Sequence, residues 1–452
     1  MISVFTPLSL TGNRYIEAAY ETLCTQTYHD WEWVVLENHG GSLPKKIRKD
    51  QRVKVYGDTQ LEGIGALKRR CCELSKGDIL FEFDHDDLLH ETALKEAHAA
   101  LMLKDGADFV VSDFAEFHSE TWSPNTYRAD CGWTHYPVTF QGHELLAQPN
   151  PPITPQNLRR VEWAPNHLRA WRTEAYWKVG GHNPELPVID DHELIVRGYL
   201  AGLRYKHIQK CLYFYRVHKE QTVTQKNQLI QTLTGQIYDK YIFELAEKFC
   251  ADATDQTGQR TPLRKIDLCG GIDTYKDYEP IDKTTGYDLD DSWDPPAWET
   301  TRNGTRHMPV ANPRGLKDNS AGVIRAFDAI EHLKNPIHTM NEAYRVLAPG
   351  GFLFISVPST DGRGAFQDPT HVSFWNENSF WYYTRASHSR YIPDFKGRFQ
   401  VTKLRSYFPG DVYDAQGNLK ESGFHRQHAI PYVEAHLIAL KPGYAPMGEV
   451  LI

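Results

Sequence analysis

Short apolar runs alternate with amphipathic stretches along the first part of the chain, and this alternation limits the fold more strongly than any other feature. The strand-like and helical patterns follow one another in the order 2–6, 14–24, 31–37, 53–56, 64–74 and 78–83. Strands that alternate with helices in this way form βαβ units, so we expect an α/β fold with a mostly parallel sheet. Prolines, asparagines and aromatics replace the periodic apolar residues from 122 to 163, which is typical of long loops near a site.

A chain of 452 residues is too long for one ordinary hydrophobic core, so two domains are expected. A helical pattern at 225–249 is followed by a polar stretch and then by a new strand-like run at 263–268. Because domain boundaries usually fall in polar segments, we assign residues 1–250 to the first domain, 251–262 to a linker and 263–452 to the second domain.

Composition and charge exclude several classes of protein. The formal net charge is -8 and no run of lysines or arginines occurs, which argues against nucleic acid or an acidic lipid surface as a partner. No apolar run is long enough to span a membrane, and the first residues lack the basic flank of a signal peptide. The seven cysteines have neither a disulfide nor a zinc-ligand spacing. We therefore expect a soluble, cytoplasmic protein with reduced thiols.

The strongest chemical signal in the first half is the run Asp-His-Asp-Asp at residues 84–87, directly after the apolar run 79–83. Two carboxylates about 5 Å apart at an effective dielectric near 20 repel each other by roughly 3 kcal/mol, so a cation or protons must compensate the cluster. Mg²⁺ and Mn²⁺ prefer such oxygen ligands and keep positions free for phosphates. On spacing alone, a solvated turn with a capping aspartate before Leu88 is an equal alternative.

The segments around this run resemble the family 2 glycosyltransferases over nearly the whole first domain. The matching segments are residues 4–7, 25–32, 35–38 and 63–69, together with the aspartate run itself. The resemblance implies a GT-A fold, whose Rossmann-like sheet binds a nucleotide-sugar donor, with a UDP-sugar as the first choice. It also implies a bound Mn²⁺ or Mg²⁺ ion as cofactor.

The same resemblance implies roles for individual residues. Asp86 would be a metal ligand, and the contacts to the donor nucleotide would come from Thr6, Pro7, Glu37, Lys68 and Asp84. Glu37 stands where the family usually has aspartate. Lys68 replaces an arginine, which keeps the charge but loses the planar fork of the guanidinium group.

Two later segments extend the resemblance. Residues 179–183 and 189–194 look like the family's Gly-Gly-Phe and Glu-Asp patterns, which implies that Asp191 is the general base of an inverting transfer. Residues 213–218 are similar to the family's Tyr-Arg-x-His segment, which implies that Arg216 binds the diphosphate and that His218 completes the metal site. Without the resemblance, the alternative for Asp191 is a carboxylate stabilised by a helix dipole. The alternative for His218 is a surface or packed side chain.

A glycan acceptor is expected to meet the divergent segment from 122 to 171, which matches no family pattern. Aromatic rings in this segment could stack on sugar faces, and the candidates are Trp133, Tyr136, Trp163 and His167.

The second half resembles class I, S-adenosylmethionine-dependent methyltransferases over roughly residues 263–441. The resemblance is carried by residues 323–333, 341–351, 352–358 and 361–374. In physical terms they predict a buried strand, an amphipathic helix that ends at a Pro-Gly-Gly turn, a second buried strand and a loop. The resemblance implies that Glu331 and His332 line the active site as catalytic residues, with a capping role at a helix start as the alternative.

The cofactor-binding end departs from the pattern of that family. Its first motif has an acidic residue followed by Gly-x-Gly, whereas here Cys269 takes the place of the first glycine, where a side chain could crowd the approach of the backbone. The resemblance implies cofactor contacts at Asp267, Gly271 and Asp282, of which Asp282 would bind the ribose hydroxyls. A methyltransferase-like domain that no longer binds S-adenosylmethionine is the alternative.

Together these patterns predict a bifunctional enzyme that transfers a sugar to a glycan acceptor and methylates a hydroxyl of that glycan. One alternative is a glycosyltransferase with a non-catalytic methyltransferase-like module. Another is a glycan-binding scaffold made of two decayed domains, against which the intact Asp84, Asp86 and Asp191 speak. A further alternative is an enzyme that modifies a nucleic-acid base or a protein side chain, which the acidic net charge disfavours.

Overall fold

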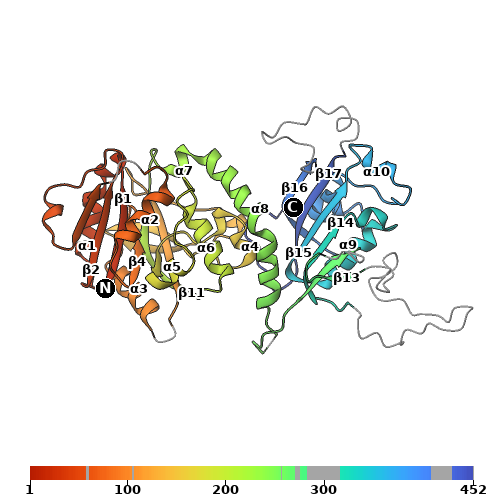
Figure 1. The fold of residues 1–452 in the computed structure, drawn as a ribbon, viewed down its shortest axis with the longest axis horizontal. Coiled ribbons are helices and arrows are strands. Elements are labelled where there is room, and N and C mark those ends of the chain that lie inside the picture. The colour runs from red at the N-terminus through yellow and green to blue at the C-terminus, as the bar shows by residue number, and fades with distance from the viewer. Residues whose placement is uncertain are drawn as a thin grey trace, which may run out of the picture. The chain divides into compact units, whose positions relative to one another are not determined.

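The computed structural model describes the chain in two compact units, Met1–Leu245 and Ala246–Ile452. Figure 1 draws the first unit from red to yellow-green and the second from green to blue. Each unit contains its own sheet and its own hydrophobic core, so the predicted α/β class is confirmed. The described residues are 1–57, 61–103, 106–255, 257–269, 275–281, 316–408 and 430–450.

The first unit is built on a mixed sheet whose parallel part has the order β3-β2-β1-β4. Of these strands, β1, β2 and β4 are buried on both faces, which is why the sequence presents them as nearly continuous apolar runs, whereas β3 at the edge is partly exposed. They are β1 (Ile2–Leu8), β2 (Trp31–Glu37), β3 (Val53–Gly57) and β4 (Ile79–Glu82). All four lie where the alternating pattern predicts them.

The sheet continues beyond β4 with strands of both directions. There β10 runs antiparallel between β4 and β6, and β11 pairs in parallel with β6 and antiparallel with β5. These strands are β5 (Leu88–Leu89), β6 (Phe109–His118), β10 (Arg169–Arg172) and β11 (Tyr205–Val217). The register places Arg169 of β10 directly opposite Glu82 of β4.

Helices cover this sheet and bring later loops close to it. The helix α2 packs a stripe that contains Gly65 and Lys68, and a side chain at Gly65 would overlap the carbonyl oxygens of Asn183 and Leu186. Glycine therefore permits the close approach of α2 to the loop before α6. The helices are α1 (Ile16–Cys24), α2 (Ile64–Leu74), α3 (Ala93–Met102), α4 (Pro155–Leu158), α5 (Thr173–Lys178), α6 (Asp190–Leu200) and α7 (Thr222–Gln225).

The segment that was expected to be a long loop contains a β-hairpin. Its turn is formed by Gln141 and Gly142, both with positive φ, as in the tight turns that join hairpin strands. The expectation of a loop was wrong here because β8 is short and contains a proline, and β9 has little apolar alternation. The strands of this segment are β7 (Pro124–Asn125), β8 (Tyr136–Phe140) and β9 (His143–Gln148).

The second unit has a six-stranded sheet in the order β13-β12-β14-β15-β17-β16, with the first four strands parallel. Its core includes Ile324, Met340, Ile355 and Phe380. The strands are β12 (Arg264–Leu268), β13 (Glu279–Ile281), β14 (Ala321–Phe327), β15 (Leu347–Pro358), β16 (Phe399–Tyr407) and β17 (Tyr432–Ala439). The helices are α9 (Pro336–Val346), α10 (Gly364–Gln367), α11 (Glu377–Thr384) and α12 (Ala386–Ser389).

The predicted Pro-Gly-Gly turn lies inside β15. Ala321 of β14 pairs with Leu347, and Val323 pairs with Phe352, so the residues between Leu347 and Phe352 form a bulge in the strand. The left-handed φ of 76° at Gly350 fits this bulge. The helix therefore ends at Val346, before the predicted turn, and the strand begins at Leu347, before the glycines.

The helix α8 (Asn227–Asp252) spans the border between the two units. Tyr241 and Leu245 contribute to the core of the first unit, whereas Cys250 packs against Gly322 of the second unit's β14. Among the helices that the structure describes, none is both long and apolar enough to cross a membrane.

Candidate functional site

The parallel strands of the first unit end at one edge of the sheet, and most of the predicted site residues lie there. Thr6 and Pro7 are near the end of β1, Glu37 ends β2, and the aspartate run follows β4. Ligands of open α/β sheets bind at this carboxyl edge.

The three carboxylates of the aspartate run have different surroundings. Asp87 is fully buried and accepts hydrogen bonds of 2.8 Å from the Tyr213 hydroxyl and from the Arg216 backbone N–H. Its pKa is raised well above the ordinary value by burial and by the neighbouring carboxylates Asp86 and Asp84. Asp87 thus holds the aspartate run against β11 by hydrogen bonds, and the carboxylates of Asp84 and Asp86 are the ones that could bind a ligand.

Asp86 and His218 meet as the sequence resemblance implies. The Asp86 Oδ2 and His218 Nε2 atoms are 2.8 Å apart, and the other ring nitrogen of His218 is 3.2 Å from Glu220 Oε2. A carboxylate and an imidazole oriented by a second carboxylate suit Mn²⁺ and leave positions for phosphate oxygens. The residues present therefore fit a divalent metal ion.

Arg216 lies beside this pair of residues. Its Nε donates a 2.6 Å hydrogen bond to the Asp86 carbonyl, and its guanidinium lies 4.9 Å from the ring centres of both Tyr15 and Phe117. The two rings hold the cation next to the aspartate run, where a diphosphate would need it.

The predicted donor contacts at the ends of β1 and β2 already have protein partners. The Thr6 hydroxyl donates to the Phe83 carbonyl at 2.6 Å and accepts from Trp33 Nε1 at 2.8 Å, so its side chain serves the fold. The Pro7 carbonyl is 3.0 Å from His85 Nδ1. Glu37 accepts a 2.5 Å hydrogen bond from the Leu43 N–H and forms an ion pair with Arg48.

Beneath the aspartate run lies a buried chain of alternating charges. Arg169 donates two hydrogen bonds, of 3.0 and 2.6 Å, to Glu82, and Lys68 forms an ion pair with the same carboxylate. The Arg169 Nη1 atom is also 2.7 Å from Asp191 Oδ2. Sequence reasoning missed Glu82 and Arg169, and the available signal was an acidic residue inside the apolar run 79–83.

Asp191 and Asp190 differ in charge and exposure. The side chain of Asp191 is 25% exposed, and against the effect of burial Arg169 and Lys68 lower its pKa. Asp190 is buried, with its Oδ2 3.5 Å from His182 Nε2, and burial raises its pKa. Of the two, Asp191 is the carboxylate that is both ionised and accessible, as a general base must be.

Arg169 and His167 link Asp191 to the aspartate run. The Arg169 Nη2 atom is 3.5 Å from His167 Nε2, which is 3.6 Å from Asp84 Oδ2. Burial and the nearby Arg169 lower the pKa of His167 well below its ordinary value, so this ring is neutral. Glu82, Asp84 and His167 also lie close enough to hold a metal ion, but Lys68 and Arg169 already neutralise Glu82.

The rings expected to stack on an acceptor are only partly available. His167 is buried and stacks on Tyr213 at 4.4 Å, and Trp133 is buried against Tyr127. Those two rings cannot contact a sugar in this conformation because protein atoms cover them. Tyr136 and Trp163 are half-buried.

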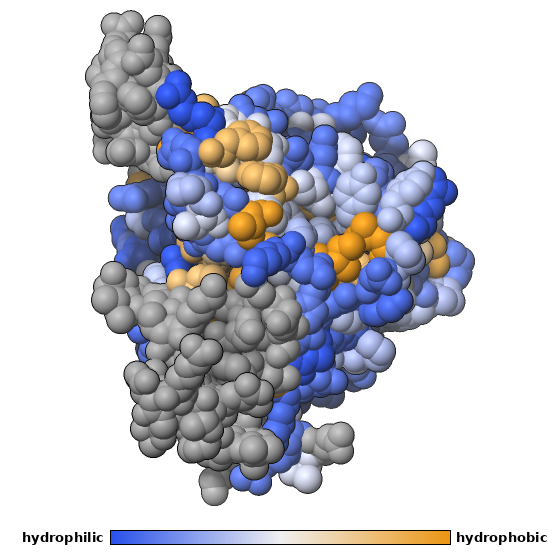
Figure 2. Space-filling model, turned by 90° about the vertical axis from the view of Figure 1, so that its right-hand side faces the viewer, coloured by the Kyte–Doolittle hydropathy of each residue, from blue (hydrophilic) through white to orange (hydrophobic). Residues whose placement is uncertain are grey.

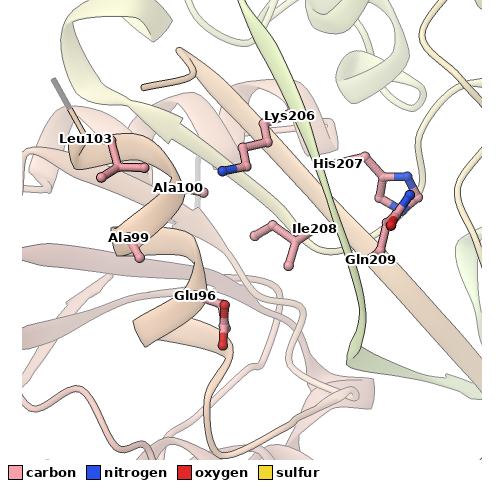
Figure 3. Close-up of a pocket in the computed structure, with 8 residues that line it drawn as sticks. All are labelled: Glu96, Ala99, Ala100, Leu103, Lys206, His207, Ile208 and Gln209. Atoms are coloured by element: carbon pink, nitrogen blue, oxygen red, sulfur yellow. The ribbon is translucent and has the colours of Figure 1, made fainter. Parts of the chain in front are cut away.

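Two hollows of the first unit differ in their relation to these residues. One of about 280 Å³ lies between α3 and β11 (Figure 3) and contains none of the predicted site residues. The other, of about 420 Å³, adjoins the end of β2 and the loop before α6. It is lined by His39, Glu62, Gly63, Pro184, Glu185, Pro187 and Lys226. This second hollow adjoins predicted site residues, because His39 closely follows Glu37 in the chain and the loop that contains Pro187 closely precedes Asp190 and Asp191.

In the second unit, Glu331 and His332 lie in a short helical turn, Ile330–His332, after the carboxyl end of β14. The Glu331 carbonyl accepts hydrogen bonds from the backbone N–H groups of Val372 and Ser373, at 2.8 and 2.9 Å. Burial raises the pKa of the Glu331 carboxyl to about 7. The loop that follows β15 is thereby held against the predicted catalytic pair.

One of the predicted cofactor contacts can be located. Asp267 lies next to the last residue of β12 and is buried, with Arg325 Nη1 2.8 Å from its Oδ1 and the Tyr275 N–H donating to its Oδ2 at 2.9 Å. Cys269 has a φ of 60°, a conformation that favours the glycine found at this position in the resembling family. Gly271 and Asp282 lie outside the described residues.

Comparisons with known proteins agree with this division. Residues 3–163 match the family model described as Glycosyl transferase family 2, and residues 238–408 match the model described as Methyltransferase domain. Among curated proteins, the chain is 25% identical over 122 residues to the glycosyltransferase GlyG of Streptococcus pneumoniae serotype 4. The match covers 26% of this chain and 40% of the length of that relative, so the chain spans less than half of the relative.

Solved structures with a similar arrangement include residues 1–349 of S. aureus TarS, at 16% identity and a TM-score of 0.38. That match covers 55% of this chain and 71% of the TarS chain. The structure of GalNAc-T7 with UDP, GalNAc and Mn²⁺ is similar at 16% identity and a TM-score of 0.37, over 49% of this chain and 44% of the other. Both resemblances seen in the sequence are confirmed by the two family models, and the chain carries a glycosyl transferase family 2 domain in its N-terminal half and a methyltransferase domain in its C-terminal half.

Proposed function

We propose that the first domain transfers a sugar, with inversion, from a nucleotide-sugar donor to a glycan acceptor in a metal-dependent reaction. The observation that carries the proposal is the arrangement at the sheet edge. An ionised, accessible Asp191 is connected through Arg169 and His167 to Asp84, next to the Asp86–His218 pair.

In this reaction Asp191 accepts the proton of the acceptor hydroxyl as that oxygen attacks the anomeric carbon of the donor. The bond from this carbon to the diphosphate oxygen breaks, and the nucleoside diphosphate leaves. Arg216 lies where it would bind the departing diphosphate. A divalent cation held by Asp86 and His218 would supply further positive charge to it.

The donor and cofactor assignments follow from the same residues. A UDP-sugar remains the first choice, with Pro7 and Glu37 at its nucleoside end and the main chain of Thr6 in place of its occupied side chain. Lys68 is buried and paired with Glu82, so it would act on the donor only through that ion pair and not by direct contact. Mn²⁺ or Mg²⁺ is the proposed ion. The chain would act in the cytoplasm on a glycan acceptor.

For the second domain we propose O-methylation of the same class of glycan with S-adenosylmethionine. The acceptor hydroxyl oxygen attacks the methyl carbon and its proton passes to solvent water, while the carbon–sulfur bond breaks and S-adenosylhomocysteine leaves with the electron pair. Asp267, Gly271 and Asp282 would hold the cofactor, and Glu331 and His332 would lie at the reacting groups. The alternative of a non-catalytic module is favoured by one observation, the strained φ of Cys269 at the position of the first glycine.

A ligand screen on the full chain tests both proposals. Nucleotide sugars are added with and without Mn²⁺, and S-adenosylmethionine is added separately, while the melting temperature is followed. A ligand at a hundred times its Kd stabilises the folded state by about 2.7 kcal/mol, which is readily seen. We expect one nucleotide sugar to act only with Mn²⁺, and release of nucleoside diphosphate once a suitable glycan is present. The absence of any response to nucleotide sugars at millimolar concentration contradicts the first proposal, and no response to S-adenosylmethionine favours the non-catalytic module.

A further inference from the structure

Three side chains of the second domain form a cluster that is separate from the metal site of the first domain. Glu331 and His332 come from the turn after β14, and His371 comes from the loop between α10 and α11. One carboxylate oxygen and one nitrogen of each ring lie within 4.8 Å of one another, and the two ring centres are 4.9 Å apart. The backbone hydrogen bonds from Val372 and Ser373 to Glu331 fix this arrangement.

Glu331 is the first reason to expect a ligand. The residue is 2% exposed, and neither carboxylate oxygen has a hydrogen-bond partner among the residues that the structure describes. A buried carboxylate without a partner is costly, so it is usually neutralised by a cation or a proton. The buried Glu82 of the first domain provides a contrast, because Lys68 and Arg169 neutralise it.

The two imidazole rings are oriented as metal ligands are. His332 Nδ1 lies 3.2 Å from the Thr370 carbonyl, and His371 Nδ1 lies 3.0 Å from the Ala365 carbonyl. Because a carbonyl oxygen can only accept, Nδ1 carries the proton in each neutral ring, and Nε2 keeps a free lone pair. A metal-binding histidine typically donates its other N–H to such a backbone acceptor.

We propose that Glu331, His332 and His371 bind a divalent first-row transition-metal ion of the kind of Zn²⁺, Co²⁺ or Mn²⁺. Two imidazoles and one carboxylate favour these ions over Mg²⁺ and Ca²⁺, which prefer oxygen ligands. Three protein ligands leave at least one coordination position open. The proposal does not depend on methyl transfer, because it concerns the ion and its ligands alone.

The cluster lies at a place in the fold where a small molecule could reach the open coordination position. The strands β14 and β15 are parallel neighbours, and the residues after their carboxyl ends supply the ligands, at the edge where doubly wound sheets bind small molecules. The loop that carries His371 and the preceding helix α10 also expose apolar side chains, with Phe366 61%, Val372 45% and Phe374 50% exposed. Figure 2, which views the second domain, shows separate orange patches on a largely blue surface. A molecule that reached the ion would therefore meet apolar side chains beside it.

The test uses the full chain with Asp86→Asn, so that the proposed metal site of the first domain is weakened. The chelator-treated protein is titrated with Co²⁺, whose visible absorption reports imidazole ligation, and Zn²⁺ is then added as competitor. We expect one Co²⁺ per chain, displaced by Zn²⁺. Glu331→Gln and His371→Gln should each weaken Co²⁺ binding by about tenfold or more.

The matched control is His388→Gln, which removes an imidazole of the same domain that lies outside the cluster. It should leave Co²⁺ binding unchanged. Circular dichroism identifies a variant that fails to fold, and His371, which lies in a loop, keeps the test valid if Glu331→Gln unfolds. No Co²⁺ binding at millimolar concentration, or equal binding in the folded Glu331→Gln and His371→Gln variants, overturns the proposal. Binding of S-adenosylmethionine is measured on the same samples, so that loss of the proposed methyl transfer is recognised separately.

Discussion

The negative charge of Asp191 is stabilised by Arg169, a residue that the sequence did not point to. Arg169 approaches it at 2.7 Å and, together with Lys68, lowers its pKa against the effect of burial. Asp191→Asn should leave donor binding nearly intact and lower turnover by about a hundredfold or more, because only the proton acceptor is lost. Calorimetry with the nucleotide sugar and nucleoside diphosphate release measure the two quantities.

The matched control for this change is Asp190→Asn, since Asp190 is the neighbouring buried carboxylate with a raised pKa. It should keep far more turnover than Asp191→Asn. Because the pKa of Asp191 is lowered, the carboxylate stays ionised down to below its ordinary range near 4, and turnover should show no loss from this group between pH 5 and pH 8. Equal turnover of Asp191→Asn and the unchanged chain would remove Asp191 as the base.

A change at Asp86 tests the proposed metal dependence. Asp86→Asn replaces a charged ligand by a neutral amide 2.8 Å from His218, so Mn²⁺-dependent donor binding should weaken by about tenfold or more. The measurement is calorimetric titration of the nucleotide sugar with and without Mn²⁺. Without the ion, the variant and the unchanged chain should bind alike. Unchanged Mn²⁺-dependent binding would exclude Asp86 as a ligand.

The sequence pointed to Asp86, His218 and Asp191 because each belongs to a recognisable run of residues. It could not reveal that the Thr6 hydroxyl is occupied by Phe83 and Trp33, or that Arg169 stands opposite Glu82, because these contacts join distant segments. His371 was noticed only as part of a loop pattern. Its approach to Glu331 depends on backbone hydrogen bonds that no local pattern encodes.

Among the elements, the antiparallel pair β16 and β17 carries a compact ion cluster. Lys403 Nζ and Arg405 Nε both lie 2.8 Å from Glu434 Oε2. Against the effect of burial, His436 and Lys403 hold the pKa of Glu434 well below its ordinary value. Such a carboxylate contributes stability above its unfolded pKa near 4, and this contribution is lost as the pH falls through the folded pKa.

Glu434→Gln should therefore lower stability by about 1–2 kcal/mol at pH 7, which corresponds to about 3–6 °C in Tm. The difference should narrow below pH 4, and thermal unfolding followed by circular dichroism at both pH values measures it. Asp318→Asn is the control, since its carboxylate is exposed and pairs with Arg345 at the surface. It should change Tm by only about 1–2 °C. A Glu434→Gln effect of equal size at pH 7 and pH 3.5 would argue for lost packing instead of lost charge.

The elements found from the sequence are those with strong periodicity. The continuous apolar runs gave β1, β2 and β4, and the amphipathic pattern gave α2 with its observed bounds. The hairpin of β8 and β9 was missed because β8 is short and contains a proline, β9 has little apolar alternation, and the turn, Gln141 and Gly142, is less distinctive than Asn-Gly. Tertiary packing against β6, which the sequence does not show locally, stabilises it.

At the scale of the whole molecule, the sequence, the structure and the family model put the border between the domains at different residues. The polar stretch puts it at 251–262, the compact units divide after Leu245, and the methyltransferase model begins at residue 238. The cause is α8, a continuous helix in which Tyr241 belongs to the core of the first unit and Cys250 packs against Gly322 of the second. A border inside a helix leaves no loop-like composition, so the sequence could indicate the two domains but not the residue that divides them.

Two separate cores should respond separately to their ligands. In calorimetric melting of the full chain, a nucleotide sugar with Mn²⁺ should raise the transition of the first domain, and S-adenosylmethionine should raise that of the second. The variant Asp191→Asn, which keeps donor binding, serves as the control that stabilisation does not require turnover. Ligand effects that always move both transitions by the same amount would mean that the two cores unfold as one unit. In that case a ligand of either domain would stabilise both domains together. Variants in one domain would then have to be tested for effects on the stability of the other.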